Sequence, residues 1–380
     1  MAEFEAKVYK LTIEEHSNAD TLEIACVGDY KSIVRKGQFK TGDLGVYIPE
    51  QAVLPQWLVS ALGLEGYLAG KAKNRVKAIK LRGVLSQGLI APCIGEQSNF
   101  PDACTFAVQN NTCSIGVMIG DDVTEFLGIT KYEPVIPTSM SGEVQRAFGL
   151  TLKYDIENIK KYPDILVDGE EVVITEKIHG TWCCFGYHPD IEDDIVTSKG
   201  LSARGLIFKI NEENLNKNLY VKTLDGTCVR DGKSGNLVAQ AKRILGNVEP
   251  FFMLGEIFGP GVQDLHYGTQ KAFCLFDVYV GPLVGGRYLN DQEKRQFVGD
   301  FAPVYQLKRV PVLYRGPYSK QIVDELTDGN ETVSGNSTNV REGIVITPTV
   351  ERYDDEIGRV ILKSVSEKYL LRKGNTTEYN

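Results

Sequence analysis

Two strand-like segments enclose a short polar stretch near the middle of this chain, and this arrangement constrains the fold more than any other feature. Residues 171–175 (EVVIT) are rich in β-branched side chains and residues 183–187 (CCFGY) are largely apolar, so both predict β-strands. Residues 176–182 (EKIHGTW) lie between them. The pattern predicts Lys177 at the turn between the strands, with its amine directed into a cleft. Gly180 is expected where the backbone approaches a phosphate or bends sharply.

Lys177 has the chemistry of a nucleophile only if its amine is uncharged. Its ordinary pKa of about 10.4 must therefore be lowered by burial or by neighbouring cations. The sequence Lys-x-His-Gly is short, and a surface lysine in a hairpin turn is the competing interpretation. The rest of the chain decides between the two.

The length of 380 residues favours two domains over one ordinary core. Hydrophobic residues make up 42% and charged residues 24%, as in soluble globular proteins. The sequence contains no apolar run of about 18 residues, and its charged N-terminus does not have the pattern of a signal peptide. We therefore expect an intracellular protein, in a compartment that the sequence does not specify, and we expect a monomer.

The cysteines and histidines do not form a metal-binding pattern. None of the eight cysteines forms a CxxC pair, and reduced thiols are the simplest account. Cys183 and Cys184 are adjacent, so in a strand they would point to opposite faces. The four histidines are scattered without ligand spacing, which disfavours zinc. The net charge of −8 argues only weakly against nucleic-acid binding, because the distribution of charge matters more than its total.

Residues 1–127 have the pattern of a small all-β module. Residues 6–11 and 22–27 alternate between apolar and polar side chains, and a polar cluster at 16–20 predicts a turn. Short strands at this spacing suggest a small barrel. The segment HSNADTLEIACVGDYKSIVRKGQFKTGDLGVYIPEQAVLP resembles the OB-type module at the N-terminus of one branch of RNA ligases and, more distantly, tRNA-binding OB modules. The resemblance implies an OB-fold RNA-binding module.

One dense basic stretch follows within this module. As a strand it would place Arg75 and Lys77 on one face, and Lys80 and Arg82 on the other. Basic groups beside an OB groove suit phosphate contacts. A solvated edge strand protected by lysines is an alternative of equal weight. The candidate RNA-binding residues are Lys71, Lys73, Arg75, Lys77, Lys80 and Arg82.

Residues 128–150 contain prolines and glycine with little apolar periodicity, so we interpret them as a linker. Residues 151–380 mix strands and helices. Asn290 and Glu293 have capping-box spacing before a helix, and residues 319–326 predict a second helix. Five apolar strands are expected around Ile174, Leu254, Leu275, Ile344 and Ile361. The fold class is therefore α+β, with an OB-type barrel followed by a domain of antiparallel sheets.

After Lys177, four further short motifs and a second lysine-containing strand follow in order, each an apolar strand that carries polar residues. They read TSKG at 197–200, FFMLGEIFG at 251–259, FCLFDV at 273–278, REGIVI at 341–346 and VILKS at 360–364. Together with Lys177, the ordered set resembles an ATP-dependent RNA ligase of the covalent nucleotidyltransferase superfamily. The N-terminal OB module points to the family 5 type. The resemblance covers essentially the whole chain.

This resemblance assigns expected roles on the nucleotide. Lys177 would become lysyl-AMP, and Glu176 and Lys199 would lie near the nucleotide, Glu176 beside the adenine. Phe276 would stack on the adenine, which recognises a base without reading sequence. Lys363 would contact the α-phosphate.

The two expected acidic residues concern the metal. Glu256 would contact the ribose or hold metal-bound water, and Glu342 would anchor the catalytic ion. A triphosphate carries dense negative charge, so lysines and Mg²⁺, with Mn²⁺ as a possible substitute, must offset charge at the reacting phosphorus. Mg²⁺ keeps most of its waters and needs only one or two carboxylates. Taken singly, both glutamates have the ordinary interpretation of surface acids, and Phe276 that of a core residue.

Two positions depart from the family pattern. The RNA ligase 2 branch commonly has Asn where this chain has Trp182, which puts in doubt a polar contact used in joining RNA ends. Many relatives have a second lysine two residues after Lys363, where this chain has Val365. Lys368 is a candidate to replace it.

The sequence thus predicts an ATP-dependent RNA ligase that seals 3′-OH and 5′-phosphate RNA ends through lysyl-AMP and RNA-adenylate, with repair at nicks as its role. An ATP-dependent DNA ligase is the alternative enzyme, disfavoured by His179 where DNA ligases favour Asp and by the domain order. A non-catalytic RNA-binding protein with a decayed transferase domain is the alternative from another class. The sequence does not specify the RNA substrate or the sugar of the template strand.

Overall fold

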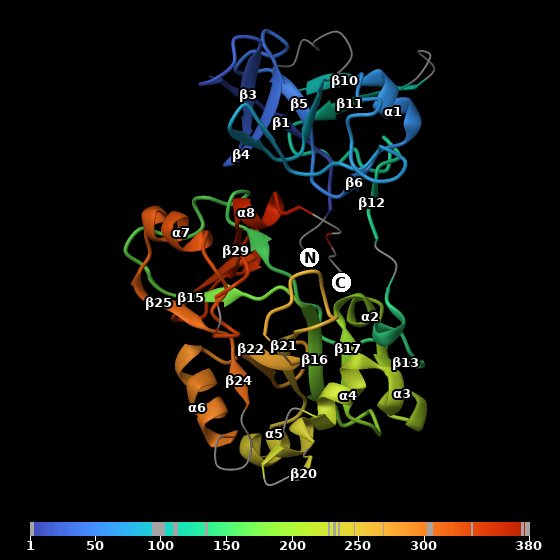
Figure 1. Cartoon of the computed structure of the whole chain (residues 1–380), viewed down its shortest axis with the longest axis vertical. Helices are drawn as coiled ribbons and strands as arrows, with labels where there is room; N and C mark the ends of the chain where they lie inside the picture. The colour runs from blue at the N-terminus through green and yellow to red at the C-terminus, as the bar shows by residue number, and fades with distance from the viewer. Residues whose placement is uncertain are drawn as a thin grey trace. The chain divides into compact units, whose positions relative to one another are not determined.

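The computed structural model describes residues 4–92, 103–108, 113–133, 136–226, 229–230, 233–234, 236–246, 248–268, 270–301, 307–335, 337–373 and 376 (Figure 1). These residues fall into two compact units. The N-terminal unit holds the described residues up to Glu133 together with Ile159–Pro163. The C-terminal unit holds those from 136 to Asn158 and from Asp164 onward. In the described parts of the chain, no helix is both long and apolar enough to cross a membrane.

The N-terminal unit is built on two three-stranded antiparallel sheets. Burial alternates along Tyr30–Arg35, as the sequence pattern predicts for a strand with one face on the core, whereas Val46, Tyr47 and Ile48 are buried in succession. The apolar side chains of the unit form two buried clusters. Hydrogen bonds from Gln87 N to Lys31 O (2.8 Å) and from Ser32 Oγ to Gln87 O (2.7 Å) join one sheet to the segment before the last strand of the other. The sheets are β1 (Lys7–Lys10), β5 (Leu44–Ile48) and β9 (Leu89–Pro92), and β2 (Thr12–Glu15), β3 (Leu22–Val27) and β4 (Tyr30–Arg35).

The predicted strand across the basic stretch is wrong. Residues 71–78 form a loop, and only β7 (Ile79–Leu81) is a strand, paired with β8 (Val84–Ser86). Lys73 has a left-handed backbone conformation (φ 53°), which interrupts an extended chain. Arg75 makes only isolated antiparallel bridges, to Val53 and to Ala69, so the pairing does not extend into a regular strand.

The remaining elements of the N-terminal unit are short. An antiparallel pair of strands is formed by β10 (Ala103–Val108) and β11 (Cys113–Met118). The unit is completed by α1 (Gln56–Ala61) and by β6 (Ala52–Val53), which pairs with β12 (Thr130–Lys131).

The segment interpreted as a linker takes part in both units. β12 pairs within the N-terminal unit, whereas η1 (Thr138–Met140) and β13 (Val144–Arg146) belong to the C-terminal unit, where β13 pairs with β18 (Leu206–Phe208). Later in the chain, Lys160 O accepts a hydrogen bond from Asp29 N at 2.9 Å within the N-terminal unit. The domain limits 1–127, 128–150 and 151–380 stay predictions.

The C-terminal unit contains two large sheets with mostly antiparallel pairing, as the fold class predicted, besides three two-stranded sheets among the described residues. One has the order β14 (Glu157–Asn158), β29 (Leu362–Val365), β26 (Gly343–Pro348), β15 (Glu171–Lys177) and β25 (Val312–Pro317). The other has the order β17 (Ile195–Ser198), β16 (Thr181–Tyr187), β21 (Phe251–Phe258), β22 (Ala272–Val280) and β23 (Arg287–Tyr288), with β24 (Lys308–Arg309) beside β22. The five strands expected around Ile174, Leu254, Leu275, Ile344 and Ile361 correspond to β15, β21, β22, β26 and β29.

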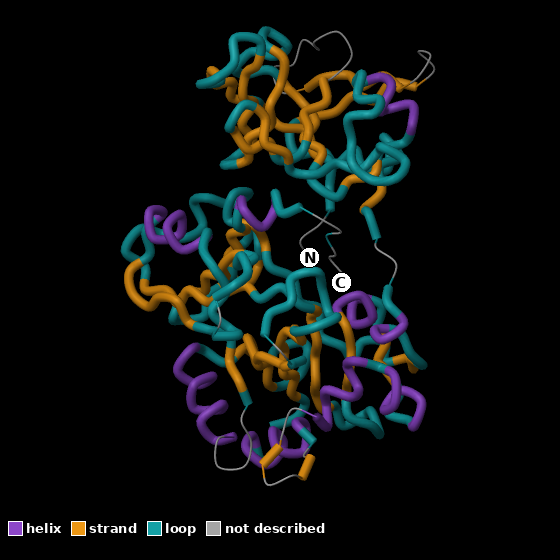
Figure 2. The backbone as a smooth tube through the Cα atoms, in the orientation of Figure 1, coloured by secondary structure: helices purple, strands orange, loops and turns teal. Residues whose placement is uncertain are grey.

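Apolar residues cover both faces of the six-stranded sheet. One cluster combines strand residues such as Cys183 and Phe185 with side chains of α4 (Leu219–Gly226), α5 (Leu237–Leu245) and α6 (Asp291–Phe301). A second cluster contains Trp182 and Cys184 together with Val345 of the five-stranded sheet, so it packs between the sheets. Cys183 and Cys184 therefore do point to opposite faces. Figure 2 shows the strands of this unit with helices around them.

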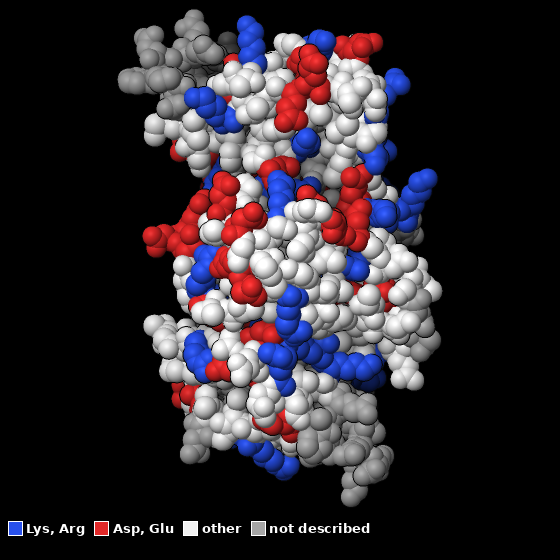
Figure 3. Space-filling model, turned by 90° about the vertical axis from the view of Figure 1, so that its left-hand side faces the viewer, with Lys and Arg blue, Asp and Glu red and all other residues white. Residues whose placement is uncertain are grey.

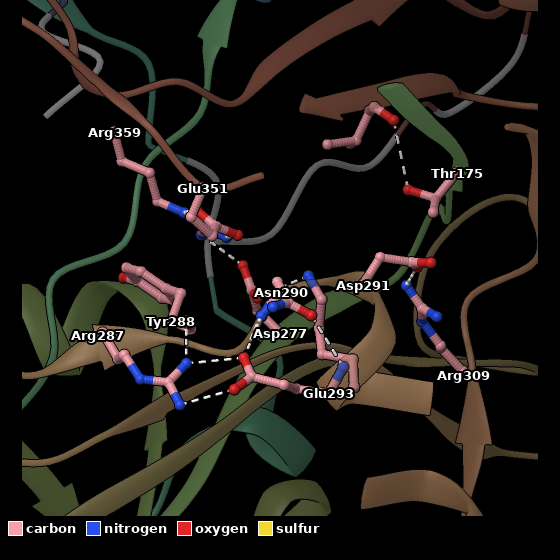
Figure 4. Close-up of polar contacts among 12 residues, drawn as sticks. Thr175, Asp277, Arg287, Tyr288, Asn290, Asp291, Glu293, Arg309, Glu351 and Arg359 are labelled. Atoms are coloured by element: carbon pink, nitrogen blue, oxygen red, sulfur yellow. Dashed lines mark hydrogen bonds and ion pairs between the residues drawn. The ribbon is translucent and has the colours of Figure 1, made fainter. Parts of the chain in front are cut away.

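The two helices that the sequence predicted in the C-terminal unit are present as α6 and α7. Asn290 N donates to Glu293 Oε2 and Glu293 N donates to Asn290 Oδ1, both at 2.9 Å, which forms a complete capping box for α6 (Figure 4). Ser319 caps α7 (Lys320–Thr327). The other elements are α2 (Lys199–Ala203), α3 (Glu212–Lys217), α8 (Glu367–Leu370), β19 (Val229–Arg230), β20 (Lys233–Ser234), β27 (Tyr353–Asp354) and β28 (Gly358–Arg359).

Candidate active site

The turn that contains the candidate nucleophile connects two different sheets. Lys177 ends β15 in the five-stranded sheet, and Thr181 begins β16 in the six-stranded sheet. Gly180 packs so closely on β21 that an added Cβ would lie 2.3 Å from Ile257 O and 2.9 Å from Glu256 Cγ. Glycine is therefore required by a close approach of backbone to backbone, and this approach brings the turn next to Glu256.

Lys177 and Glu342 form the central ion pair. Lys177 Nζ donates to Glu342 Oε1 at 2.5 Å, and both side chains are mostly buried. Burial, the largest influence, favours the neutral acid, but Lys177 and His179 outweigh it and lower the pKa of Glu342 to about 2. Gly343 allows Glu342 to reach this position, because a Cβ there would lie 2.1 Å from Ser364 O of β29.

Glu256, Lys363 and Lys199 surround this pair. Burial raises the pKa of Glu256 to about 8, with Glu342 adding to the rise and Lys177 and Lys199 opposing it. Burial lowers the pKa of Lys363 to about 8, and the charges of Lys177 and Lys199 lower it further. These mutual influences mean that the five predicted residues, which are far apart in sequence, gather in one charged cluster.

Lys199 is oriented by a partner of its own. Its Nζ lies 2.7 Å from Asp155 Oδ1, and it begins α2, which Ser198 caps. Asp155 did not figure in the sequence prediction. An acid that tethers a lysine beside the cluster holds that lysine's charge in place.

The residues described here fit a divalent ion through carboxylates alone. No group of three or more His, Cys, Asp or Glu side chains among the described residues could hold a metal. Burial is the main cause of the raised pKa of Glu256, and the charge of Glu342 adds to it, so a cation bound beside the two carboxyls would favour the ionised form of Glu256. Two carboxylates suffice for Mg²⁺, which keeps most of its waters.

Phe276 stands at an irregularity in its strand. The register between β21 and β22 shifts after Leu254, which pairs with Asp277, whereas Gly255 pairs with Leu275. Phe276 is thus the extra residue of a β-bulge, a feature that re-aims a side chain. Its half-buried ring lies 5.4 Å from that of Tyr154, centroid to centroid. The site is suited to presenting one aromatic face to a ligand, as the adenine-stacking prediction requires.

Glu176 directly precedes Lys177 in β15 and is almost completely buried. Thr332 donates from its N (2.8 Å) and its Oγ1 (2.5 Å) to Glu176 Oε2, whereas Oε1 has no hydrogen-bond partner among the described residues. Burial raises the pKa of this carboxyl. A buried polar atom without a partner fits the prediction that Glu176 contacts a nucleotide base.

A buried ionic network that the sequence did not predict is centred on Asp277, the residue after Phe276; Figure 4 draws Asp277 with Arg359. Asp277 accepts hydrogen bonds from Arg359 Nη1 (2.5 Å), Lys294 Nζ (3.0 Å) and Tyr154 Oη (3.0 Å). Burial opposes the charge of Asp277, but Arg359 and Lys294 outweigh it and lower the pKa of this carboxyl. The network ties β22 to α6 and to β28.

Trp182, the first of the two expected departures from the family pattern, lies in β16. It is directly opposite Glu256 in the pairing of β16 and β21, and its Nε1 is buried without a hydrogen-bond partner among the described residues. The indole packs in the cluster between the two sheets with Tyr154.

The predicted RNA-binding residues lie in the N-terminal unit and adopt two environments. Lys71, Lys73, Lys80 and Arg82 are exposed. Lys77 is half-buried, and the half-buried Arg75 guanidinium stacks over the Tyr132 ring at 4.0 Å. An aromatic ring with basic groups suits a nucleic-acid surface, but Arg75 also serves the packing of its own unit.

His179 is the most strongly engaged residue of the turn. It contacts Glu342, Asp264 and Tyr369, and burial lowers its pKa less than Asp264 and Glu342 raise it. Asp264, Tyr369 and also Arg372 escaped the sequence prediction. No local pattern marks them, because they contact a residue 85 or more positions away.

Comparison with known proteins gives consistent matches. A family model described as RNA ligase matches residues 170–365, and a model described as an OB-fold domain matches residues 6–93. A variant of the Naegleria gruberi RNA ligase without nucleotide is similar in structure, with a TM-score of 0.74, 24% identity and coverage of 97% of this chain and 98% of that chain. No curated protein matches the chain.

Two further structures of the Naegleria gruberi enzyme are similar in fold. A variant solved with ATP and Mn has a TM-score of 0.73 and 24% identity, covering 97% of each chain. The enzyme solved with PPi has a TM-score of 0.72 and 24% identity, covering 97% of this chain and 98% of that chain.

Proposed function

The chain belongs to the RNA ligase family, and from this premise we propose that it uses ATP to join a 3′-OH to a 5′-phosphate RNA end, repairing nicks. The observation that carries the proposal is the charged cluster around Lys177. One amine at a strand end, paired with Glu342 and flanked by Lys363 and Lys199, has the composition needed to accept an adenylyl group. Similar structures solved with ATP and Mn or with PPi support ATP as the nucleotide.

The first step transfers AMP to the enzyme. Lys177 Nζ attacks the α-phosphorus of ATP, a P–N bond forms, the bond from that phosphorus to the bridging oxygen breaks, and pyrophosphate leaves. The amine must first lose a proton and its pairing with Glu342. The cations Lys363 and Lys199 beside Lys177 oppose the charge of its amine, whereas the ion pair with Glu342 favours it, so release from Glu342 is part of activating the nucleophile.

The later steps use the activated phosphate. The 5′-phosphate oxygen of the RNA attacks the lysyl-AMP phosphorus and releases Lys177. The 3′-OH then attacks the RNA 5′-phosphorus, which forms the phosphodiester and releases AMP. A divalent ion at Glu256 and Glu342, Mg²⁺ or Mn²⁺, would supply charge neutralisation at the phosphate oxygens. Phe276 and Glu176 hold the base, Lys199 and Lys363 the phosphate.

The experiment that tests this function follows the label of α-³²P-ATP. Wild-type protein with Mg²⁺ should become labelled, and Lys177→Ala should abolish labelling, because no other amine replaces the nucleophile. Lys153→Ala, an exposed lysine of the same unit, is the matched control and should label normally. Labelling that persists in Lys177→Ala would reject the assignment.

Sealing assays then separate the alternatives. Nicked duplexes with RNA or DNA on each side of the nick are incubated with wild-type protein. Sealing of RNA 3′-OH ends supports the proposal, whereas sealing restricted to DNA ends supports a DNA ligase. Protein that binds RNA but never accepts label would be the non-catalytic alternative.

A further inference from the structure

His179 is held at both nitrogens of its ring. Its Nε2 lies 2.8 Å from Asp264 Oδ1, and its Nδ1 lies 2.9 Å from the Tyr369 hydroxyl and 3.8 Å from Glu342 Oε2. A carboxylate only accepts hydrogen bonds, so Nε2 carries a hydrogen and donates a hydrogen bond to Asp264. The ring is only 3% exposed. Its rotation is therefore blocked by directional contacts as well as by packing.

Asp264 is itself fixed by an arginine from the end of the chain. Arg372 donates from Nε to Asp264 Oδ2 (2.8 Å) and from Nη2 to Oδ1 (3.2 Å), a bidentate pair that sets the plane of the carboxylate. The Arg372 side chain is 7% exposed. Because Oδ1 also accepts the bond from His179, the orientation of Arg372 is transmitted to the imidazole.

Arg372 and Tyr369 support each other. The guanidinium lies 3.8 Å above the Tyr369 ring centre, and Arg372 Nη1 donates to Tyr369 O at 3.0 Å. Tyr369 is 2% exposed and stands in α8, whose N-terminus Ser366 caps. Both residues follow β29, which contains Lys363, so a short and well-anchored segment delivers them.

We propose that Asp264, Tyr369 and Arg372 form a clamp that positions His179 against Glu342, and through Glu342 orients Lys177 for adenylylation. The proposal rests on the proposed function and adds three positioning residues to it. Tyr369 and Arg372 lie beyond residues 170–365, the segment that the family model matches. The expected consequence of loosening the clamp is a slower chemical step with little change in ATP binding. Partners of this kind around a site typically affect activity by about 10- to 100-fold.

The turn is also held from the same loop by a second contact. Gln263, the neighbour of Asp264, donates from Nε2 to Gly180 O at 2.7 Å. The loop after β21 therefore contacts the turn twice: Gln263 binds the backbone oxygen of Gly180, and Asp264 binds the ring of His179. Removing the clamp alone leaves the backbone contact intact, which makes a selective loss of His179 orientation measurable.

The test uses the full-length protein and single-turnover labelling with α-³²P-ATP over a range of ATP concentrations. Tyr369→Phe removes only the hydroxyl and should lower the maximum adenylylation rate about 10-fold, with half-saturating ATP changed less than about 2-fold. Arg372→Gln should lower it at least as much, and Arg372→Lys should recover only part of the loss because lysine lacks the bidentate fork. Tyr279→Phe, which removes a buried hydroxyl bonded to Pro282 O, is the matched control and should keep the wild-type rate.

Three results would overturn the clamp: an unchanged maximum rate in Tyr369→Phe, a loss expressed only in half-saturating ATP, or a loss that follows the melting temperature and is matched by Tyr279→Phe. Nuclear magnetic resonance of ¹⁵N-histidine-labelled protein gives a readout that does not require activity, since the chain has four histidines. His179 should show a protonated Nε2 whose signal moves in Tyr369→Phe and Arg372→Gln. A His179 signal that neither variant perturbs would reject the clamp, whether or not the wild-type protein forms lysyl-AMP. Wild-type protein that forms no lysyl-AMP would instead reject the proposed function.

Discussion

At the scale of single residues, neighbouring charges and burial set the protonation states of the two glutamates in the cluster. Glu342 is kept ionised by Lys177 and His179, whereas burial favours the neutral acid at Glu256. Two adjacent carboxyls with such different pKa values have different local environments, which is a common arrangement in active sites. A cation that binds between them would favour ionisation of both.

Glu256→Ala and Glu342→Ala should each slow lysine adenylylation by about 100-fold or more, because charge at the reacting phosphate would lose its compensation. The measurement is the labelling rate across a Mg²⁺ titration, with circular dichroism to verify the fold. Glu171→Ala, an exposed acid at the start of the same strand as Lys177, serves as control. If either variant labels at the wild-type rate at every Mg²⁺ concentration, that residue has no metal role in this step.

At the scale of elements, the bulge in β22 and the Asp277 network act together. The bulge turns Phe276 out of the regular strand, and the adjacent Asp277 is fixed by Arg359 of β28 and Lys294 of α6. Arg359 is further oriented by a bidentate pair with Glu351 and by stacking 3.7 Å above the Tyr288 ring. The position of the candidate adenine-stacking ring therefore depends on three separate elements.

Asp277→Asn should reduce the free energy of unfolding at pH 7 by about 3–5 kcal/mol, because two buried cations lose their counter-charge. The pKa of Asp277 is lowered in the folded state, so its stabilising contribution is present above the unfolded value and is lost as pH falls through the folded value. Urea unfolding at pH 7 and at acid pH should show that the variant has lost part of the acid sensitivity of the wild type.

Asp300→Asn is the control for this prediction, since Asp300 is an exposed acid of α6 that accepts a hydrogen bond from Gln296. If Asp277→Asn lowered the free energy of unfolding no more than Asp300→Asn does, the stabilising role of the network would be contradicted.

At the scale of the whole molecule, the residues predicted to bind the nucleotide and those predicted to bind RNA belong to different units. All residues expected to act on the nucleotide belong to the C-terminal unit, whereas the exposed basic residues Lys73, Lys80 and Arg82 belong to the N-terminal unit. On the face drawn in Figure 3, basic and acidic side chains are interspersed. A net charge of −8 is therefore compatible with local phosphate contacts.

Replacing Lys73, Lys80 and Arg82 together by Gln should weaken sealing of nicked RNA and leave lysyl-AMP formation unchanged. Each lost phosphate contact should make the salt slope of binding less negative by about 0.7–0.9, or about 2–3 for all three. Lys36→Gln with Lys40→Gln, exposed positions of the same unit, is the control. An unchanged slope would remove these residues from the RNA surface.

These substitutions test the N-terminal unit better than its deletion. A fragment that starts near Ile129 should still form lysyl-AMP and seal poorly. However, Ile159–Pro163 packs with the N-terminal unit, so the fragment would also expose that segment.

Local patterns in the sequence determined the strands around Lys177, the capping box of α6 and the order of the motifs. Each depends on residues within a few positions of one another, where alternation and capping chemistry act directly. The predicted residues Lys177, Glu256, Glu342, Lys363 and Lys199 do gather in one cluster. Their roles, and those of Glu176 and Phe276, stay predictions.

Only the tertiary structure decided how distant segments meet. It placed β15 and β16 in different sheets, turned the basic stretch into a loop, and brought Tyr369 to His179 across 190 residues of chain. Such contacts depend on strand order and on which backbone groups are already paired, and no local pattern encodes them. The sequence alone therefore identified the residues of the candidate site, whereas the tertiary structure decided which other side chains contact them.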